Sequence, residues 1–165
     1  MNVINILLNI ILFCIFGQLA TISHEFGHAI PALLLTKDSV RIFLGNNTTE
    51  IKEISLGRLC IQIGKFQPVL GFTYWNRGKL LKWQSIVICI GGPIFSLLIG
   101  LSLLFISGVV HYYLLKKLIF FLAFYNIWQF ICTAIPIIYP NWWVGYGGCR
   151  SDGYNIMSII KNEQF

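Results

Sequence analysis

Three long apolar stretches constrain this chain more than any other feature. They run over residues 3–35, 83–110 and 117–139, and each reaches the roughly 20 residues that a helix needs to cross a bilayer. Charged residues make up only 11% of the chain, whereas soluble domains carry about 25%. We therefore predict a mainly α-helical membrane protein with three core transmembrane helices.

A different pattern separates the first two apolar stretches. Within residues 37–82, short segments alternate polar and apolar residues between Gly, Asn and Pro, which is typical of strands and turns. We predict a small membrane-associated β-sheet there, antiparallel and formed within residues 39–76.

The remaining segments complete the predicted organisation. Residues 140–151 are rich in Gly and Trp and are predicted to form a loop. A short helix is predicted over 152–162, capped by Ser151 or Asp152. The five cysteines include no C-x-x-C pair, so we expect neither a disulfide framework nor a cysteine zinc site. We interpret residues 1–165 as one domain.

The basic residues predict how the chain lies in the membrane. Eight of them lie between the first two apolar stretches and two between the second and third. By the positive-inside rule, the strand-rich segment and the C-terminus are cytoplasmic and the N-terminus is outside, in a multi-pass protein of the cell membrane. The first stretch is longer than the roughly 7–15 residues of a signal-peptide core, so we expect it to be retained. The basic residues are not interleaved with aromatics, which disfavours nucleic acid as a partner.

The first apolar stretch contains HEFGH at residues 24–28, an H-E-x-x-H motif. Residues four apart share one helix face, so His24 and His28 can bind one metal ion from adjacent turns. Glu25 lies about 100° further round the helix, where it can reach a metal-activated water. Ionisable residues are costly in a bilayer, which favours a zinc site with Glu25 as general base over histidines satisfied by backbone or water.

A catalytic zinc site needs a third protein ligand. The remaining histidine, His111, is predicted at the outer end of the second span, and we interpret it as an interfacial residue. Four acids have the sequence context of solvated surface charges: Asp38, Glu50, Glu53 and Glu163. Asp152 follows the inward end of the third span, on the same side as the motif. It is either the third ligand, reached if residues 139–151 fold back, or a plain helix N-cap.

Gly91, Gly92 and Pro93 interrupt the second apolar stretch at about the depth of His24. Small residues let helices approach closely, and proline can kink a helix. These residues therefore either serve packing alone, or make room beside the metal and free backbone groups for substrate. Both interpretations stay open, and Gly92 and Pro93 are candidate substrate contacts.

In order and spacing, these motifs resemble the site-2 protease family, the intramembrane zinc metalloproteases. HEFGHA at 24–29 matches its first motif, and GGPIFSLL at 91–98 is similar to its G-P-x-x-N motif. YNIWQFICTAIP at 125–136, followed by SDG at 151–153, looks like the last core helix, in which N-x-x-P precedes an aspartate–glycine pair. The resemblance implies one Zn²⁺ per chain, held by His24, His28 and Asp152.

The chain departs from the family pattern at three places. Ser96 stands where the family has Asn, and Thr133 stands at the Asn expected before the proline, with Asn126 one helical face away. Residues 136–152 are longer than the usual connection. Asn126, Thr133 and Asn141 are therefore alternative candidates for oxyanion or substrate contacts.

The resemblance implies an enzyme that takes part in regulated intramembrane proteolysis. We predict an intramembrane zinc endopeptidase, a hydrolase of transmembrane protein or peptide substrates, with Glu25 as general base. The predicted sheet can offer an edge to an extended substrate. The alternative is an inactive relative that binds or retains a membrane partner, which the intact Glu25 disfavours. Membrane di-iron hydroxylases need more than the three histidines present, and a transporter would carry ionisable residues in several spans.

Overall fold

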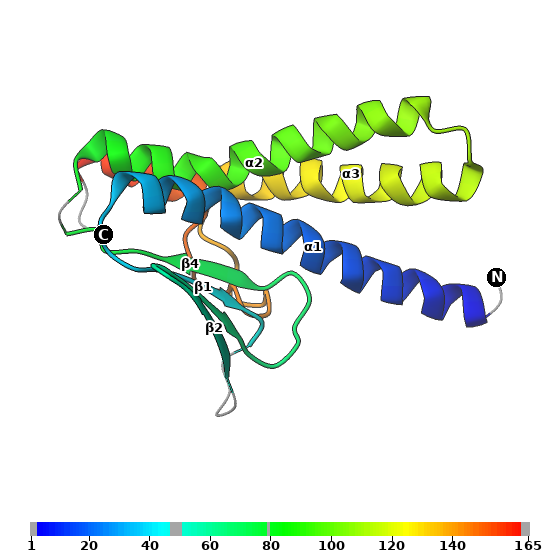
Figure 1. The fold of residues 1–165 in the computed structure, drawn as a ribbon, viewed down its shortest axis with the longest axis horizontal. Coiled ribbons are helices and arrows are strands. Elements are labelled where there is room, and N and C mark those ends of the chain that lie inside the picture. The colour runs from blue at the N-terminus through cyan, green and yellow to red at the C-terminus, as the bar shows by residue number, and fades with distance from the viewer. Residues whose placement is uncertain (1–2, 47–50, 79, 163–165) are drawn as a thin grey trace.

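The structure is a computed structural model that describes residues 3–46, 51–78 and 80–162. Its elements are, in chain order, α1 (Val3–Leu35), β1 (Val40–Leu44), β2 (Lys52–Leu56), β3 (Leu59–Ile63), β4 (Gly71–Tyr74), α2 (Lys82–Val109), α3 (Tyr113–Ala134) and α4 (Asp152–Lys161) (Figure 1). The prediction of a mainly helical protein with a small sheet between the first two long helices is confirmed.

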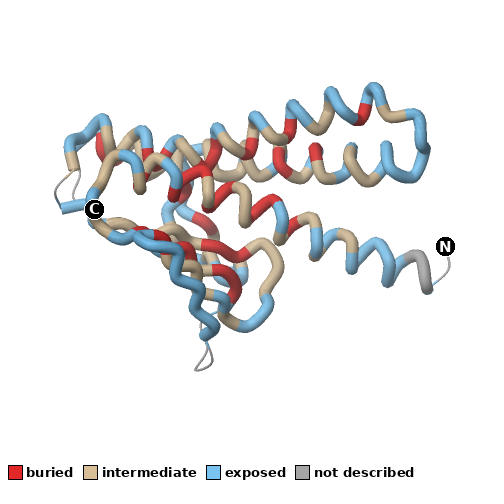
Figure 2. The backbone as a smooth tube through the Cα atoms, in the orientation of Figure 1, coloured by how far each residue is buried: buried red, intermediate tan, exposed pale blue. Residues whose placement is uncertain are grey.

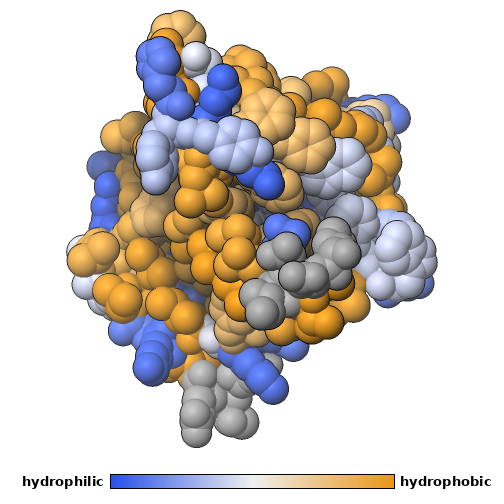
Figure 3. All heavy atoms as spheres, turned by 90° about the vertical axis from the view of Figure 1, so that its right-hand side faces the viewer, coloured by the Kyte–Doolittle hydropathy of each residue, from blue (hydrophilic) through white to orange (hydrophobic). Residues whose placement is uncertain are grey.

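Three of the described helices are long and apolar enough to cross a membrane: Ile6–Leu35 of α1, and all of α2 and α3. Helices α2 and α3 lie side by side, and α1 diverges from them toward its N-terminus (Figure 1). Exposed residues dominate the N-terminal half of α1 (Figure 2). Seen from the end that carries the α2–α3 connection, apolar side chains cover most of the visible surface (Figure 3). Such outer faces suit contact with lipid tails.

The third span differs from the prediction at both ends. We expected it over 117–139, whereas α3 runs from Tyr113 to Ala134. Pro136 explains the early end, because the residue before a proline is driven out of the helical region. Ile135 accordingly has an extended backbone, with ψ at 129°. The first two long helices agree with their predicted bounds to within one residue.

The sheet is mixed, so the prediction of a purely antiparallel sheet is wrong. Its strand order is β2-β3-β1-β4. β2 and β4 pair antiparallel with their neighbours, but β1 and β3 run parallel. The prediction assumed that consecutive strands are neighbours, which does not always hold. Here β3, with its buried Leu59, takes an inner position and the fully exposed β2 takes the edge, because burying the more apolar strand is more favourable.

The hydrophobic core lies where the C-terminal third of α1 meets the sheet and α2 (Figure 2). Its buried members are Ala29, Ala32, Val40, Ile42, Leu44, Leu59 and Ile88. Alternation along β1 turns three of these residues to one face, as expected for a strand. β1 is thereby anchored against α1, and its partner β4 becomes an edge strand beside the same helix.

Candidate metal centre

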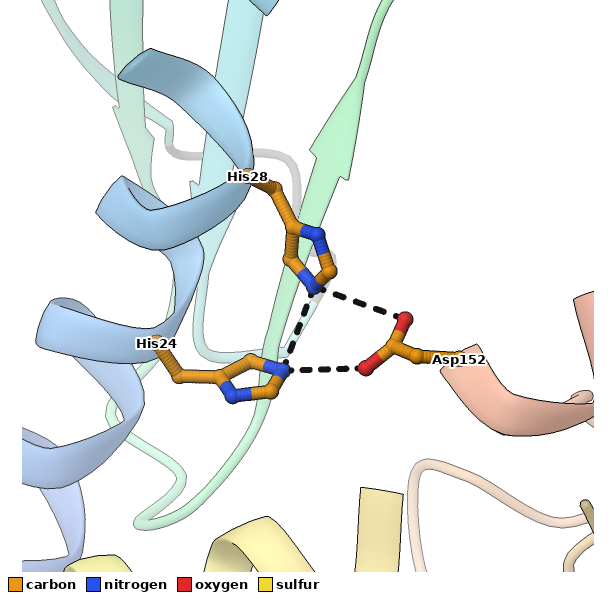
Figure 4. Close-up of side chains that lie close together, drawn as sticks. All are labelled: His24, His28 and Asp152. Atoms are coloured by element: carbon orange, nitrogen blue, oxygen red, sulfur yellow. Dashed lines mark hydrogen bonds and ion pairs between the residues drawn. The ribbon is translucent and has the colours of Figure 1, made fainter. Parts of the chain in front are cut away.

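Two adjacent turns of α1 and the first turn of α4 bring His24, His28 and Asp152 together (Figure 4). The two histidine Nε2 atoms are 3.2 Å apart. His24 Nε2 lies 3.2 Å from Asp152 Oδ2, and His28 Nε2 lies 3.4 Å from Asp152 Oδ1. Within the described residues, this is the one group of three or more His, Cys, Asp or Glu side chains whose ligand atoms converge enough to hold a metal ion.

These separations fit a zinc ion. Ligand atoms about 2.0–2.1 Å from zinc lie about 3.3–3.4 Å apart at tetrahedral angles, close to the observed distances. Two imidazoles and one carboxylate also form a donor set of catalytic zinc sites, which keep a fourth position open. Both the spacing and the chemistry of the three side chains therefore suit this metal.

Each histidine is oriented through its other ring nitrogen. His28 Nδ1 lies 2.7 Å from the carbonyl oxygen of Ile88, and His24 Nδ1 lies 3.0 Å from Ser96 Oγ. The Gly92 N–H also points at this nitrogen, from a longer distance of 3.4 Å. Because a carbonyl only accepts, a proton on Nδ1 satisfies the shorter contact, and this tautomer leaves Nε2 available as a ligand. A bond donated to Ser96 selects the same tautomer in His24. Partners of this kind fix the orientation of metal-binding histidines.

In the sequence, Ser96 stands out only as a departure from the family pattern. Its contact with His24 depends on how α2 packs against α1, and the two residues are 72 positions apart. Because nothing local in the sequence signals that packing, the contact became visible only in the tertiary structure.

Ser151, and not Asp152, caps α4. Ser151 Oγ accepts a hydrogen bond from the Tyr154 N–H at 3.1 Å and donates to the Ile135 carbonyl at 2.6 Å. The N-cap interpretation of Asp152 is therefore wrong, and its carboxylate is available to the histidines. Burial alone would raise the pKa of Asp152, but the two histidines hold it well below its ordinary value, so the side chain is ionised.

Residues 135–151 leave the end of α3 and return to it. Backbone hydrogen bonds join Tyr139 N to Cys149 O at 2.9 Å and Ser151 N to Ile137 O at 3.0 Å. These bonds hold the two ends of the segment close together, so α4 begins beside the end of α3. The return of this segment is what brings Asp152 to the histidines of α1.

Glu25 lies beside the three potential ligands and is buried. Thr73 Oγ1 of β4 donates to Glu25 Oε2 at 2.7 Å, and the Glu25 backbone carbonyl is 3.1 Å away. A cleft of about 390 Å³ opens here, lined by His24, Glu25, His28 and Asp152 together with β4 and residues 149–151. The arrangement places a carboxylate, a potential metal site and a strand edge around one space.

Gly92 provides room for one of the histidines. A Cβ atom on Gly92 would overlap the ring of His28. Pro93 follows as a buried residue within a continuous α2. The open question on this segment thus has a structural answer at Gly92, where the absent side chain makes space beside the potential ligands.

The other candidates lie apart from the cleft. Asn126 is buried, and its Nδ2 donates to the Leu122 carbonyl of its own helix. Thr133 Oγ1 donates to the Gln129 carbonyl at 3.0 Å. Asn141 is exposed in the 135–151 segment. None of these three candidates is among the residues that line the cleft.

The alternative ligands are not brought to this site. His111 is exposed in the α2–α3 connection. Glu53 is exposed on β2, where it accepts a hydrogen bond from Gln62. Asp38 lies between α1 and β1, and Glu50 and Glu163 fall outside the described residues.

Comparison with known proteins gives a family for the chain. A model of the family described as Peptidase M50B-like matches residues 1–145. The match includes α1 with its H-E-x-x-H motif and ends before Asp152. No curated protein matches. Zinc metallopeptidases form this family, although it includes inactive members. The match covers most of the chain, and the chain therefore belongs to the Peptidase M50B-like family, which is a site-2 protease family.

Proposed function

We propose that this protein is an intramembrane zinc endopeptidase that hydrolyses peptide bonds of transmembrane proteins. The convergence of His24, His28 and Asp152 beside Glu25, at the head of a cleft, supports this most strongly. The three ligands would hold one Zn²⁺ per chain, and residues 1–165 would act as a single catalytic domain.

Zinc held by these ligands would supply a Lewis acid and bring the pKa of a water toward 7. Glu25 would accept a proton from the attacking water and pass it to the leaving amine. Thr73 would keep the Glu25 carboxylate aimed into the cleft through its 2.7 Å hydrogen bond. Ser96 and the Ile88 carbonyl would keep both histidine Nε2 atoms directed at the metal.

The substrate would bind as an extended segment along β4. Among the described strands, β4 pairs only with β1, so beyond Gly71 its other edge is open to an added strand. Thr73 belongs to β4 and also contacts Glu25, so a substrate on this edge would lie next to the proposed base. Gly92 and Pro93 would shape the site from the α2 side. Asn126 and Thr133 would have no direct part in the reaction, because their polar groups bond within their own helix.

The sheet would lie on the cytoplasmic side of the membrane. The excess of basic residues between α1 and α2 supports this orientation, with the N-terminus outside and the C-terminus inside the cell. A reporter enzyme that is active only in the cytoplasm should be active when fused after Phe165. Activity only with an export-dependent reporter at that position would reverse the orientation.

Metal content and proteolysis test the proposed function together. Purified wild type should hold about one zinc per chain, whereas His28→Ala and Asp152→Ala should lose it. Glu25→Gln should keep zinc and lose cleavage of a library of synthetic transmembrane peptides. Zinc retained by Asp152→Ala would remove the third ligand. A metal-free wild type that cleaves nothing would favour an inactive relative that retains a membrane partner.

A further inference from the structure

A tyrosine hydroxyl lies on the open edge of β4. Tyr146 belongs to the 135–151 segment, and its Oη accepts a hydrogen bond from the Gly71 N–H at 3.0 Å. The same oxygen lies 3.0 Å from the Val69 carbonyl and 3.1 Å from the Gly71 carbonyl, and it can donate to one of them. The Tyr146 hydroxyl therefore takes up the N–H of Gly71, the first residue of β4, and lies within hydrogen-bond distance of the Gly71 carbonyl.

These backbone groups are the ones that an added strand would use. The Leu70 carbonyl accepts from Gly45 N, on the side of β1. Because successive residues of a strand point their backbone groups to opposite sides, those of Gly71 and Thr73 point away from β1. Tyr146 thus takes, at Gly71, the position of a partner strand's main chain. Thr73, two residues further along, is not engaged by it.

Tyr146 is held firmly in this position. Its ring packs against Phe72 and Tyr139, with centroids 5.2 and 5.6 Å away. The Tyr146 carbonyl accepts from Cys149 N at 2.8 Å, and the neighbouring Gly147 N–H donates to the Trp143 carbonyl at 2.8 Å. Burial raises the pKa of Tyr146 well above its ordinary value, so the hydroxyl stays protonated and remains a donor. The Tyr146 hydroxyl is therefore held in one position beside Gly71, where it blocks pairing by an added strand.

We propose that Tyr146 is a specificity-determining residue that ends the substrate-pairing edge of β4 at Thr73. The proposal rests on the proposed function, since it assumes that an extended substrate adds to this edge. Main-chain pairing tolerates many sequences, and a strand slides in steps that change which residues face the site. Because Tyr146 occupies the backbone of Gly71, the substrate would pair with β4 only from Thr73 onward. This limit would set the register of the substrate strand and so determine which of its peptide bonds lies beside Glu25.

Backbone methylation of a bound peptide tests whether Tyr146 blocks pairing at Gly71. The probe is a ten-residue Val-Thr-Ser peptide tethered to a leucine–alanine transmembrane helix, with single N-methyl groups placed at successive positions. Affinity is measured by fluorescence anisotropy in detergent, on Glu25→Gln protein with Tyr146 intact and on Glu25→Gln/Tyr146→Ala, which removes both the hydroxyl and the ring that holds it beside Gly71. The double variant should gain one further methyl-sensitive position, two residues from a position already sensitive. At that position methylation should weaken binding about 2- to 10-fold, as expected for one hydrogen bond.

Two controls keep the test decisive. Tyr113→Ala makes the same chemical change at an exposed residue at the start of α3 and should leave the pattern unchanged. Zinc content of the Tyr146→Ala protein reports whether the site is still assembled. In protein with Tyr146 intact, the peptide should slow amide hydrogen exchange at Thr73 and leave exchange at Gly71 unchanged.

Three results would overturn the proposal: identical methylation patterns with and without the Tyr146 hydroxyl, slower exchange at Gly71 when peptide binds, or no peptide binding to either protein. The binding assay needs no turnover. A wild-type protein that holds no zinc and cleaves nothing would therefore count against the proposed function alone. The effect of Tyr146 on peptide binding could still be measured.

Discussion

Two hydroxyl groups from different elements contact the residues of the H-E-x-x-H motif. Ser96 of α2 is fully buried, and its Oγ lies 3.0 Å from His24 Nδ1. Thr73 of β4 lies 2.7 Å from the carboxylate of Glu25. His24, a potential ligand, and Glu25, the proposed base, are therefore each held by one neighbouring hydroxyl, and each neighbour can be changed without touching the motif.

Removing the Ser96 hydroxyl should weaken zinc binding. Ser96→Ala leaves His24 Nδ1 without its partner, so the ring can rotate and the other tautomer becomes accessible. Loss of such a partner typically costs about 10- to 100-fold in metal affinity. Competition with a zinc-binding dye measures the affinity. Ser107→Ala is the matched control, since Ser107 is also buried in α2 but donates to the Leu104 carbonyl of its own helix. Equal affinities in the two variants would show that the Ser96 contact does not orient His24.

Removing the Thr73 hydroxyl should lower the rate of cleavage without removing zinc. Thr73→Val keeps the shape of the side chain but no longer holds the Glu25 carboxylate. A poorly positioned base should reduce kcat by about 10-fold or more, within the range that general-base catalysis contributes. Thr73→Ser should restore most of the rate because it keeps a donor. A rate unchanged in Thr73→Val, at equal zinc content, would contradict a positioning role.

At the scale of elements, one glycine-rich turn of α2 controls how closely that helix approaches α1. A Cβ atom on Gly27 would lie 2.7 Å from the Gly91 carbonyl oxygen, so the two helices cross with almost no space between their backbones. Gly92, next along the chain, faces the ring of His28. Small residues at a helix crossing thus determine both the packing and the position of a potential ligand.

The Gly92→Ala substitution should disturb both the packing of α2 on α1 and the position of His28. The added methyl group overlaps His28, and overpacking of this kind costs about 1–3 kcal/mol. We expect a lower thermal midpoint in detergent and a loss of zinc. Gly108→Ala, in the same helix, is the control because a Cβ there meets nothing within 4 Å. That control should stabilise the protein by about 0.5–1 kcal/mol through helix propensity. Zinc binding that survives Gly92→Ala unchanged would contradict the close contact with His28.

In the molecule as a whole, the site draws on four elements. α1 carries two potential ligands and the proposed base, α4 carries Asp152, α2 supports the histidines and β4 borders the cleft. The 135–151 segment links two of these elements, because it delivers Asp152 and also places Tyr146 on β4. Metal, base and substrate edge therefore depend on one another through the fold.

Metal retention should depend on pH through the histidines. Zinc binds neutral imidazole, and an ordinary histidine has a pKa of about 6.5, so protons compete with the metal as the pH falls below that value. Asp152 does not limit binding in this range, because its pKa is held below its ordinary value. Zinc affinity, measured by competition with a chelator between pH 8 and pH 5, should fall steeply below about pH 6.5. An affinity that does not change down to pH 5 would contradict ligation by two histidines.

The long helices were predictable because their signal is local. A long apolar segment in a bilayer must satisfy its own backbone hydrogen bonds, so it forms a helix whatever packs beside it. The predicted bounds of α1 and α2 therefore agree with the structure to within one residue. The strand order was not predictable in the same way, since β3 displaced β2 from β1 through burial at a core built from distant residues. The end of α3 was misjudged because hydropathy outweighed the effect of Pro136 in the prediction.

The membrane helices, the H-E-x-x-H motif and the family resemblance follow from the amino-acid order alone, since they depend on residues close together or in a recognisable order. That order left Asp152 between a ligand and a helix cap. The folded chain settles this, because Ser151 caps α4. The fold also brings Ser96 to His24, Thr73 to Glu25 and Tyr146 to Gly71. These last three contacts join residues 48 to 75 positions apart. Their energy comes from packing between elements, and no local pattern in the chain encodes that packing.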